Sequence, residues 1–162
     1  GLVYLLLRIV MIAHIDHVNI SVQDLARSVH FYSGLLGFEK TTDAHLEGEW
    51  IETIVGLKGV VADVSYVQPP GGGPRIELIK YHAPAGTAID TNSLPNTRGL
   101  RHLAFRVTDM DGIYERLTAA DVEFIGPPVI VPPTIVTHDA GHKKLCYFYD
   151  PDNVVLELAE YT

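Results

Sequence analysis

The stretch DHVNISVQDLARSVHFYSGLLGF, residues 16–38, predicts a β-strand followed by an amphipathic helix. Apolar side chains alternate with polar ones around Val18 and Ile20, which is the two-residue period of a strand with one buried face. Asp24 can accept hydrogen bonds from the free amides of a helix start, and Gly37 can adopt the left-handed conformation that ends a helix. We therefore expect a strand and a helix joined by a short capped turn.

The same plan is repeated at residues 101–124, RHLAFRVTDMDGIYERLTAADVEF. His17 at the start of the first copy corresponds to His102 at the start of the second. Each copy is also followed by a strand with one acid among apolar neighbours, Glu77 in RIELI and Glu157 in VLELA. An internal repeat of this kind predicts two equivalent modules.

Turn-rich segments divide each copy into the order βαβββ, so the expected fold class is α+β with two tandem modules. The expected strands are 15–22, one beginning at 39–42, 59–67 and 75–81, and then 100–107, 122–126, 144–149 and 154–160. A helix is expected at 110–120, and a loop with one short helical turn at 43–58. We expect a single domain, residues 14–162, with modules 14–81 and 99–162 joined by a linker at 82–98.

Residues 1–13, GLVYLLLRIVMIA, form an expected N-terminal extension. This run is too short to span a bilayer, and Arg8 interrupts it. An apolar segment of this kind packs more often on its own protein or on a neighbouring subunit than it performs chemistry. We expect it to be dispensable for any metal site.

Composition excludes some classes of partner. The chain has 162 residues with a formal net charge of −8, and it has no basic stripe that could neutralise phosphates, so we expect no nucleic-acid partner. No membrane segment is expected either. The single cysteine, Cys146, excludes an intramolecular disulfide and favours a reducing cytoplasm. Cys146 is expected to be a small buried residue.

The repeated histidines and glutamates are the candidate site. His17, Glu77, His102 and Glu157 occupy matching positions in the two copies, whereas a single histidine or glutamate on a strand is usually an ordinary core or surface residue. Two imidazoles and two carboxylates without a thiolate suit one divalent ion such as Ni, Co, Zn, Mn or Fe. Burying two carboxylates would be costly unless a positive charge lies between them. The remaining histidines lack a counterpart and are expected on the surface, the linker or loops: His14, His30, His45, His82, His138 and His142.

The motifs IDHVNISVQDLARSVHFYSGLLGF, RIEL, RHLAFRV and YDPDNVVLEL, in this order, resemble the vicinal oxygen chelate superfamily of glyoxalases, bleomycin-resistance proteins and extradiol dioxygenases. The resemblance implies two βαβββ modules that form a half-open β-sheet cup around one metal. In the glyoxalase I branch, His17, Glu77, His102 and Glu157 match the metal ligands, and the glutamates also move the proton. The resemblance thus implies that Glu157 and Glu77 are catalytic.

The leading hypothesis is a metal-dependent lyase or isomerase that transfers a proton next to the chelated carbonyl of a small-molecule substrate. The alternatives are an Fe(II) extradiol-type dioxygenase, a methylmalonyl-CoA epimerase-like enzyme and a non-catalytic drug-binding resistance protein. Ala62 stands where the epimerase branch has a second base, and the adjacent Asp63 is expected to face the other way. Basic residues for a glutathione adduct are expected to be scattered: Arg75, Arg101 and Arg106. A homodimer is expected.

Overall fold

The computed structural model describes residues 12–89, 94–135 and 141–162. Its first half contains β1 (His17–Ser21), α1 (Leu25–Val29), the π-helical turn η1 (His30–Leu35), β2 (Glu39–Glu47), α2 (Glu49–Val55), β3 (Val61–Gln68) and β4 (Arg75–Ala83). Its second half contains β5 (His102–Val107), α3 (Met110–Ala119), β6 (Val129–Ile130), the 3₁₀ turn η2 (Pro133–Ile135), β7 (Lys143–Tyr149) and β8 (Val155–Tyr161).

The two halves form two four-stranded sheets of the same topology. The strand order is β1-β4-β3-β2 in one sheet and β5-β8-β7-β6 in the other. In each sheet the first and last strands of the half pair in parallel, β1 with β4 and β5 with β8, and the other pairs are antiparallel. The predicted tandem βαβββ fold is confirmed.

Equivalent caps begin the two main helices. The Asp24 carboxylate accepts a hydrogen bond of 2.9 Å from the amide of Arg27, and the Asp109 carboxylate accepts one of 3.1 Å from the amide of Gly112. Each satisfies an amide that the first helical turn leaves without a partner. The repeated aspartate therefore has the same structural role in both halves.

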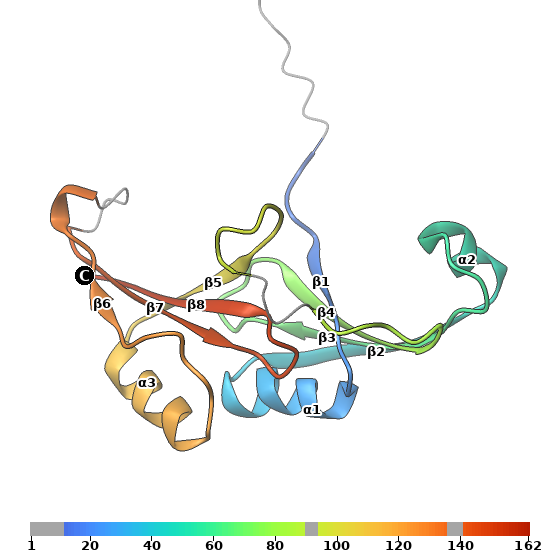
Figure 1. Ribbon diagram of the computed structural model, residues 1–162, viewed down its shortest axis with the longest axis horizontal. Coiled ribbons are helices and arrows are strands. Elements are labelled where there is room, and N and C mark those ends of the chain that lie inside the picture. The colour runs from blue at the N-terminus through green and yellow to red at the C-terminus, as the bar shows by residue number, and fades with distance from the viewer. Residues whose placement is uncertain (1–11, 90–93, 136–140) are drawn as a thin grey trace, which may run out of the picture.

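Both main helices, α1 and α3, lie on the same side of the sheets, below them in Figure 1. In the described parts of the chain no helix covers the middle of the opposite side, and α2 and η2 stand at the two ends of the layer (Figure 1). One apolar cluster joins the two halves beneath the sheets. It includes Ile20, Phe31, Tyr32, Ile76 and Leu78 from the first half and Met110, Leu117, Phe148, Leu156 and Leu158 from the second.

A turn of the second half also binds the first half directly. Asp150 is only 4% exposed, and its carboxylate accepts a hydrogen bond of 2.9 Å from the hydroxyl of Tyr32 in η1. Asp152, two residues later, accepts one of 2.8 Å from the amide of Gln23, just before α1. The turn between β7 and β8 is therefore tied to the start of the first helix.

Two predicted segments were wrong in their details. The expected loop at 43–58 is instead the continuation of β2 to Glu47 followed by α2, because Ile51 of α2 packs with Val60 and Ala62 in a second apolar cluster. The expected strand at 122–126 is a single bridge between Phe124 and Phe148. Backbone hydrogen bonds from Ile125 to Tyr147 and from Tyr149 to Glu123 flank that bridge. Pro127 and Pro128, which have no N–H to donate, then interrupt the pairing with β7 until the short β6.

Histidines expected on the surface, the linker or loops include two that lie on strands. His45 lies within β2, and His82 lies near the end of β4, which runs to Ala83 rather than stopping at 81. Cys146 is buried, as predicted. Most of the N-terminal extension, residues 1–11, lies outside the described residues. No helix in the described parts of the chain is long and apolar enough to cross a membrane.

Candidate metal and proton-transfer site

Strand alternation places the first candidate pair on the face of the sheet away from α1. Ile20 of β1 belongs to the apolar core and Val18 is half-buried on the same face, so His17 and Asn19 project to the other side. Glu77 of β4 is the register partner of Asn19. The parallel pairing of β1 with β4 therefore brings the predicted histidine and glutamate to neighbouring strands.

His17 and Glu77 come close together. His17 Nε2 lies 3.9 Å from Glu77 Oε2, and Nδ1 on the other side of the ring lies 2.7 Å from Asp16 Oδ1. The hydrogen bond to His17, together with the Arg75 guanidinium, holds the pKa of Asp16 below its ordinary value. A carboxylate on the far nitrogen is the usual means of orienting a metal-binding imidazole. Asp16 therefore directs Nε2 of His17 toward Glu77.

Both oxygens of Glu77 accept hydrogen bonds. Asn19 Nδ2 donates to Oε1 at 2.6 Å, and the Tyr66 hydroxyl of β3 donates to Oε2. Burial, followed by the hydrogen bond to Glu77, raises the pKa of Tyr66 to about 12. Sequence reasoning missed Asn19 and Tyr66. The signal for Asn19 was its position two residues after His17, whereas Tyr66 required the β3–β4 register.

The second pair lies on β5 and β8. Glu157 is 6% exposed, and its partners in register are Ala104 on β5 and Tyr147 on β7. The ring of His102 lies 5.0 Å from the ring of Tyr147, centroid to centroid. Burial, and then the charge of Glu157, raises the pKa of Tyr147. In the first half the rings of His17 and Tyr66 are also in contact, with centroids 6.0 Å apart, so the tyrosine opposite the glutamate lies beside the histidine in both halves.

Each half thus supplies one histidine and one glutamate on adjacent strands. Their nitrogen and oxygen donors suit a divalent transition metal, and the 3.9 Å between His17 Nε2 and Glu77 Oε2 is close to the spacing of two neighbouring ligands. Within the described residues of one chain, no three histidine, cysteine or acidic side chains form a group that could hold a metal. The four-residue ligand set stays a prediction, and its two half-sites would need to meet at one ion.

A second histidine cluster lies away from these pairs. The carboxylate of Asp63 on β3 contacts His45 Nδ1 at 2.8 Å and His82 Nε2 at 2.7 Å, and these contacts lower the pKa of Asp63. Asp63 and Tyr66 are three residues apart on one strand, so Asp63 faces the opposite side of the sheet from Glu77, as expected. His138 lies outside the described residues, and His14 and His142 are exposed.

Sequence comparison gives a family and several relatives. The family model described as "Glyoxalase/Bleomycin resistance protein/Dioxygenase superfamily" matches residues 14–158. "Uncharacterized protein YaeR" of Escherichia coli (strain K12) is 31% identical over 149 residues, which cover 90% of this chain and 95% of the relative. A 2-epi-5-epi-valiolone epimerase of an Actinomyces species is 28% identical over 149 residues, which cover 89% of this chain and 77% of the relative.

Solved structures share the fold. A glyoxalase family protein from Bacillus cereus superposes with a TM-score of 0.78 at 27% identity, covering 93% of this chain and 95% of that one. The fosfomycin resistance protein FosX from Listeria monocytogenes, solved with Mn(II) and sulfate, superposes with a TM-score of 0.59 at 21% identity, covering 94% and 95%. Since the family model spans most of the chain and the two-module fold matches, this protein belongs to the glyoxalase, bleomycin resistance protein and dioxygenase superfamily.

Proposed function

We propose that this protein is a metal-dependent glyoxalase-type lyase or isomerase that moves a proton next to the carbonyl of a small-molecule substrate. The observation that carries the proposal is the repeated pair of one histidine and one glutamate on parallel, hydrogen-bonded strands of each sheet. The hydrogen bonds around the first pair support the proposal, because Asp16 orients the His17 ring, and Asn19 and Tyr66 donate to the Glu77 carboxylate. Such support around a ligand is typical of metal sites.

Four side chains would hold the ion: His17, Glu77, His102 and Glu157. Their mixed nitrogen and oxygen donors suit Ni, Co, Zn, Mn or Fe. FosX contains Mn(II), so the shared fold is compatible with a divalent ion. When bound, the ion would act as a Lewis acid that polarises the substrate carbonyl and favours loss of the neighbouring proton.

Glu157 is the general base in this proposal. The C–H bond next to the carbonyl breaks, its electron pair moves toward the carbonyl oxygen, and Glu157 takes the proton and then returns it to carbon. Glu157 is nearly buried, and the residue opposite it on β5 is Ala104, which has no side-chain donor. Glu77 is the second catalytic carboxylate, and its two hydrogen bonds hold the carboxylate in a fixed direction.

The epimerase relative supports proton transfer over oxygen insertion. The Actinomyces relative is named as an epimerase, a class that inverts a stereocentre, and its match extends over 89% of this chain. The number of coordination positions left for the substrate also favours proton transfer. If all four side chains bound one octahedral ion, two positions would be left, which is enough for adjacent substrate oxygens but not for a catechol and O₂ together.

We also propose a cytoplasmic homodimer in which a second copy completes the metal site. The support is that the described residues of one chain provide half-sites of two residues and no group of three. A mixing experiment tests it: His17→Ala and His102→Ala variants, each inactive alone, should regain activity when unfolded and refolded together. Refolded mixtures without any recovered activity would place both half-sites in one chain.

The central test is hydrogen exchange without oxygen. Candidate hydroxy-ketones and thiol adducts of 2-oxoaldehydes are incubated with the metal-loaded protein in D₂O under nitrogen, and deuterium at the carbon next to the carbonyl is measured by NMR. We expect incorporation that depends on Glu157. Oxygen uptake with a catechol, together with no exchange in any hydroxy-carbonyl compound, would contradict the proposal and favour the dioxygenase alternative.

A further inference from the structure

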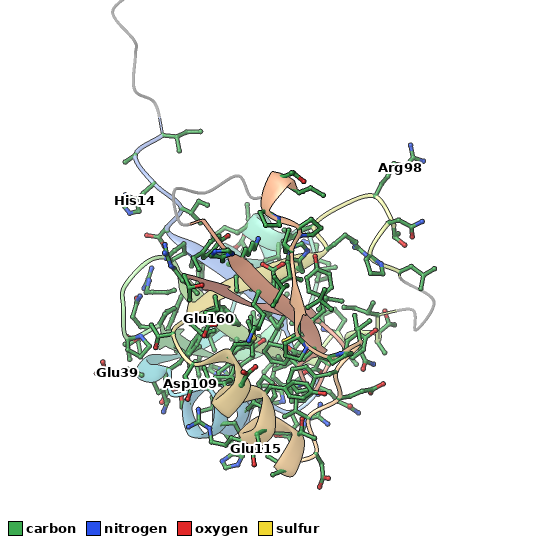
Figure 2. The ribbon with its side chains drawn as sticks, turned by 90° about the vertical axis from the view of Figure 1, so that its left-hand side faces the viewer. His14, Glu39, Arg98, Asp109, Glu115 and Glu160 are labelled. Carbon is green, nitrogen blue, oxygen red and sulfur yellow. The ribbon has the colours of Figure 1, made fainter. Side chains whose placement is uncertain are left out.

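The face of the second sheet away from α3 carries more than the His102 and Glu157 pair. Along β8, Glu157, Ala159 and Tyr161 alternate with Leu158 of the apolar core, so these three share the face away from α3. The side chain of Glu160 lies on the opposite face, where its carboxylate accepts a hydrogen bond of 2.9 Å from the amide of Met110 at the start of α3. Figure 2 shows Glu160 close to α3 and Asp109.

Two cations from neighbouring strands meet at the ring of Tyr161. Arg106 on β5 places its Cζ 4.8 Å from the ring centroid, and Lys143 on β7 places its Nζ 5.2 Å from it. Lys143 is the register partner of Tyr161, and Arg106 lies four residues after His102 on the same strand. Arg106, which the sequence analysis expected to be one of several scattered arginines, therefore lies with Lys143 at a single ring on the same face as the proposed site.

These two cations have no carboxylate partner among the residues that the structure describes. Two other cations on the strands do have one. Lys144, the next residue on β7, contacts Asp111 at 3.2 Å, and Arg75 contacts Asp16 at 2.6 Å. A hydrogen bond to Tyr161 and the charge of Glu157 raise the pKa of Lys143, so its ammonium is charged at neutral pH and lies within the field of Glu157.

Small or apolar side chains separate the cations from the proposed base. Ala159 and its register partner Leu145 lie between the level of Glu157 and that of Tyr161, and Ala104 lies between His102 and Arg106. Four residues along a strand span about 13 Å, and the long arginine and lysine side chains can shorten that gap. The face therefore has a reactive end, a short apolar strip and a cationic end.

We propose that Arg106 and Lys143, held against Tyr161, bind a terminal oxyanion of the substrate, so that the substrate is an anionic hydroxy-carbonyl compound. The guanidinium fork and the ammonium are the usual partners of phosphate and carboxylate groups. The reacting end of this inference rests on the proposed function, whereas the anion subsite rests on the cation pair alone. A phosphate and a carboxylate share this chemistry, and the experiment distinguishes them.

The test measures binding separately from turnover. Isothermal titration calorimetry on the full chain compares 1-deoxy-D-xylulose with its 5-phosphate, and 5-hydroxy-4-oxopentanoate with its neutral methyl ester, at low and high salt. We expect the favoured anion to bind at least about tenfold more tightly than its neutral counterpart. Arg106→Gln and Lys143→Gln should each reduce that preference by about tenfold or to nothing, and added salt should weaken it. The larger preference, for phosphate or for carboxylate, identifies the anion.

Lys144→Gln is the matched control, because it removes one positive charge from the same strand on the opposite face. It should leave the anion preference within twofold of wild type. Equal binding of charged and neutral compounds by the wild type, or an equal loss in Lys144→Gln, would overturn the subsite. A preference for anions without deuterium exchange would support the subsite and contradict the proposed function. Deuterium exchange at equal rates with charged and neutral compounds would support the proposed function and contradict the subsite.

Discussion

The two halves of this protein place a glutamate at the same point of the same sheet topology, yet they treat it differently. In the first half Glu77 accepts hydrogen bonds from Asn19 and Tyr66. In the second, Ala104 occupies the position equivalent to Asn19, and Tyr147 packs beside His102. The backbones are equivalent, but the Asn19 side chain holds the Glu77 carboxylate in place, whereas Ala104 provides no such donor to Glu157.

This difference suggests a division of roles between two carboxylates that the repeat alone would make equal. A carboxylate with both oxygens bound is suited to be a permanent ligand, because any movement would break two charge-assisted hydrogen bonds. A base must accept a proton, and it therefore needs an oxygen lone pair that no hydrogen-bond donor already occupies. We therefore propose that Glu77 acts mainly as a ligand and Glu157 mainly as the base, and the following experiments test that proposal.

The largest expected effect separates the two glutamates directly. Glu157→Gln should lower the rate of deuterium exchange by about 10²–10⁴, the usual contribution of a positioned base. Glu77→Gln should act first on metal binding, measured by calorimetry with Mn(II) or Co(II). Glu115→Gln, on the outer side of α3 (Figure 2), is the control for loss of one carboxylate and should change neither quantity. Equal losses of rate and of metal affinity in both variants would remove the division of roles.

Exchanging the residues opposite the glutamates should sharpen the comparison. Asn19→Ala makes the first half like the second and should weaken metal binding by about 10–100-fold, as loss of a ligand-orienting partner does. Ala104→Asn gives Glu157 a side-chain donor and should slow exchange without weakening metal binding. Ser21→Ala, on the same face of β1, is the control. Unchanged metal affinity in Asn19→Ala would show that its hydrogen bond is not needed to hold Glu77.

A third experiment asks whether the halves are independent modules. Tyr32→Phe removes the hydroxyl that donates to Asp150 and leaves a nearly buried carboxylate short of one partner. The free energy of unfolding should fall by about 1–3 kcal/mol, and both halves should still unfold in one transition, measured by urea denaturation followed by circular dichroism. Tyr81→Phe, on the other face of the sheet, is the matched control. Two separate transitions in the wild type would contradict a shared core.

The smallest expected effect is a pH dependence at the same junction. Burial raises the pKa of Asp150, so between its ordinary value of 3.8 and its raised value the folded state binds more protons than the unfolded state. The contribution of this group to stability is therefore full below pH 3.8 and falls as the pH rises through the raised pKa. Asp150→Asn removes this term while keeping an acceptor oxygen. Its stability relative to wild type should rise with pH over that window, and a flat difference would contradict the assignment.

Much of the fold could be predicted because it depends on local patterns and on a repeat. Alternation around Val18 and Ile20 and the caps at Asp24 and Asp109 indicate strands and helices without any tertiary information, and the structure has them. Patterns that depend on packing were less informative. Phe124 lies in a stretch with the composition of a strand, but Pro127 and Pro128 follow it without an N–H to donate, so only one bridge forms with Phe148.

The candidate site divides in the same way. His17, Glu77, His102 and Glu157 are identified by matching positions in the two copies, which is information that the sequence holds by itself. Asn19, Tyr66 and Asp16 are not, because their roles depend on strand register and on the direction of single side chains. The sequence alone does not give the strand register or the distances between these side chains.

The sequence by itself determined that this protein has two equivalent βαβββ modules, each with one histidine and one glutamate on its parallel strand pair. Only the tertiary structure decided which neighbours each glutamate has, and that Arg106 and Lys143 share the ring of Tyr161. The physical reason is that a two-residue period states which face a side chain occupies. The register between strands far apart in the chain decides what it meets there.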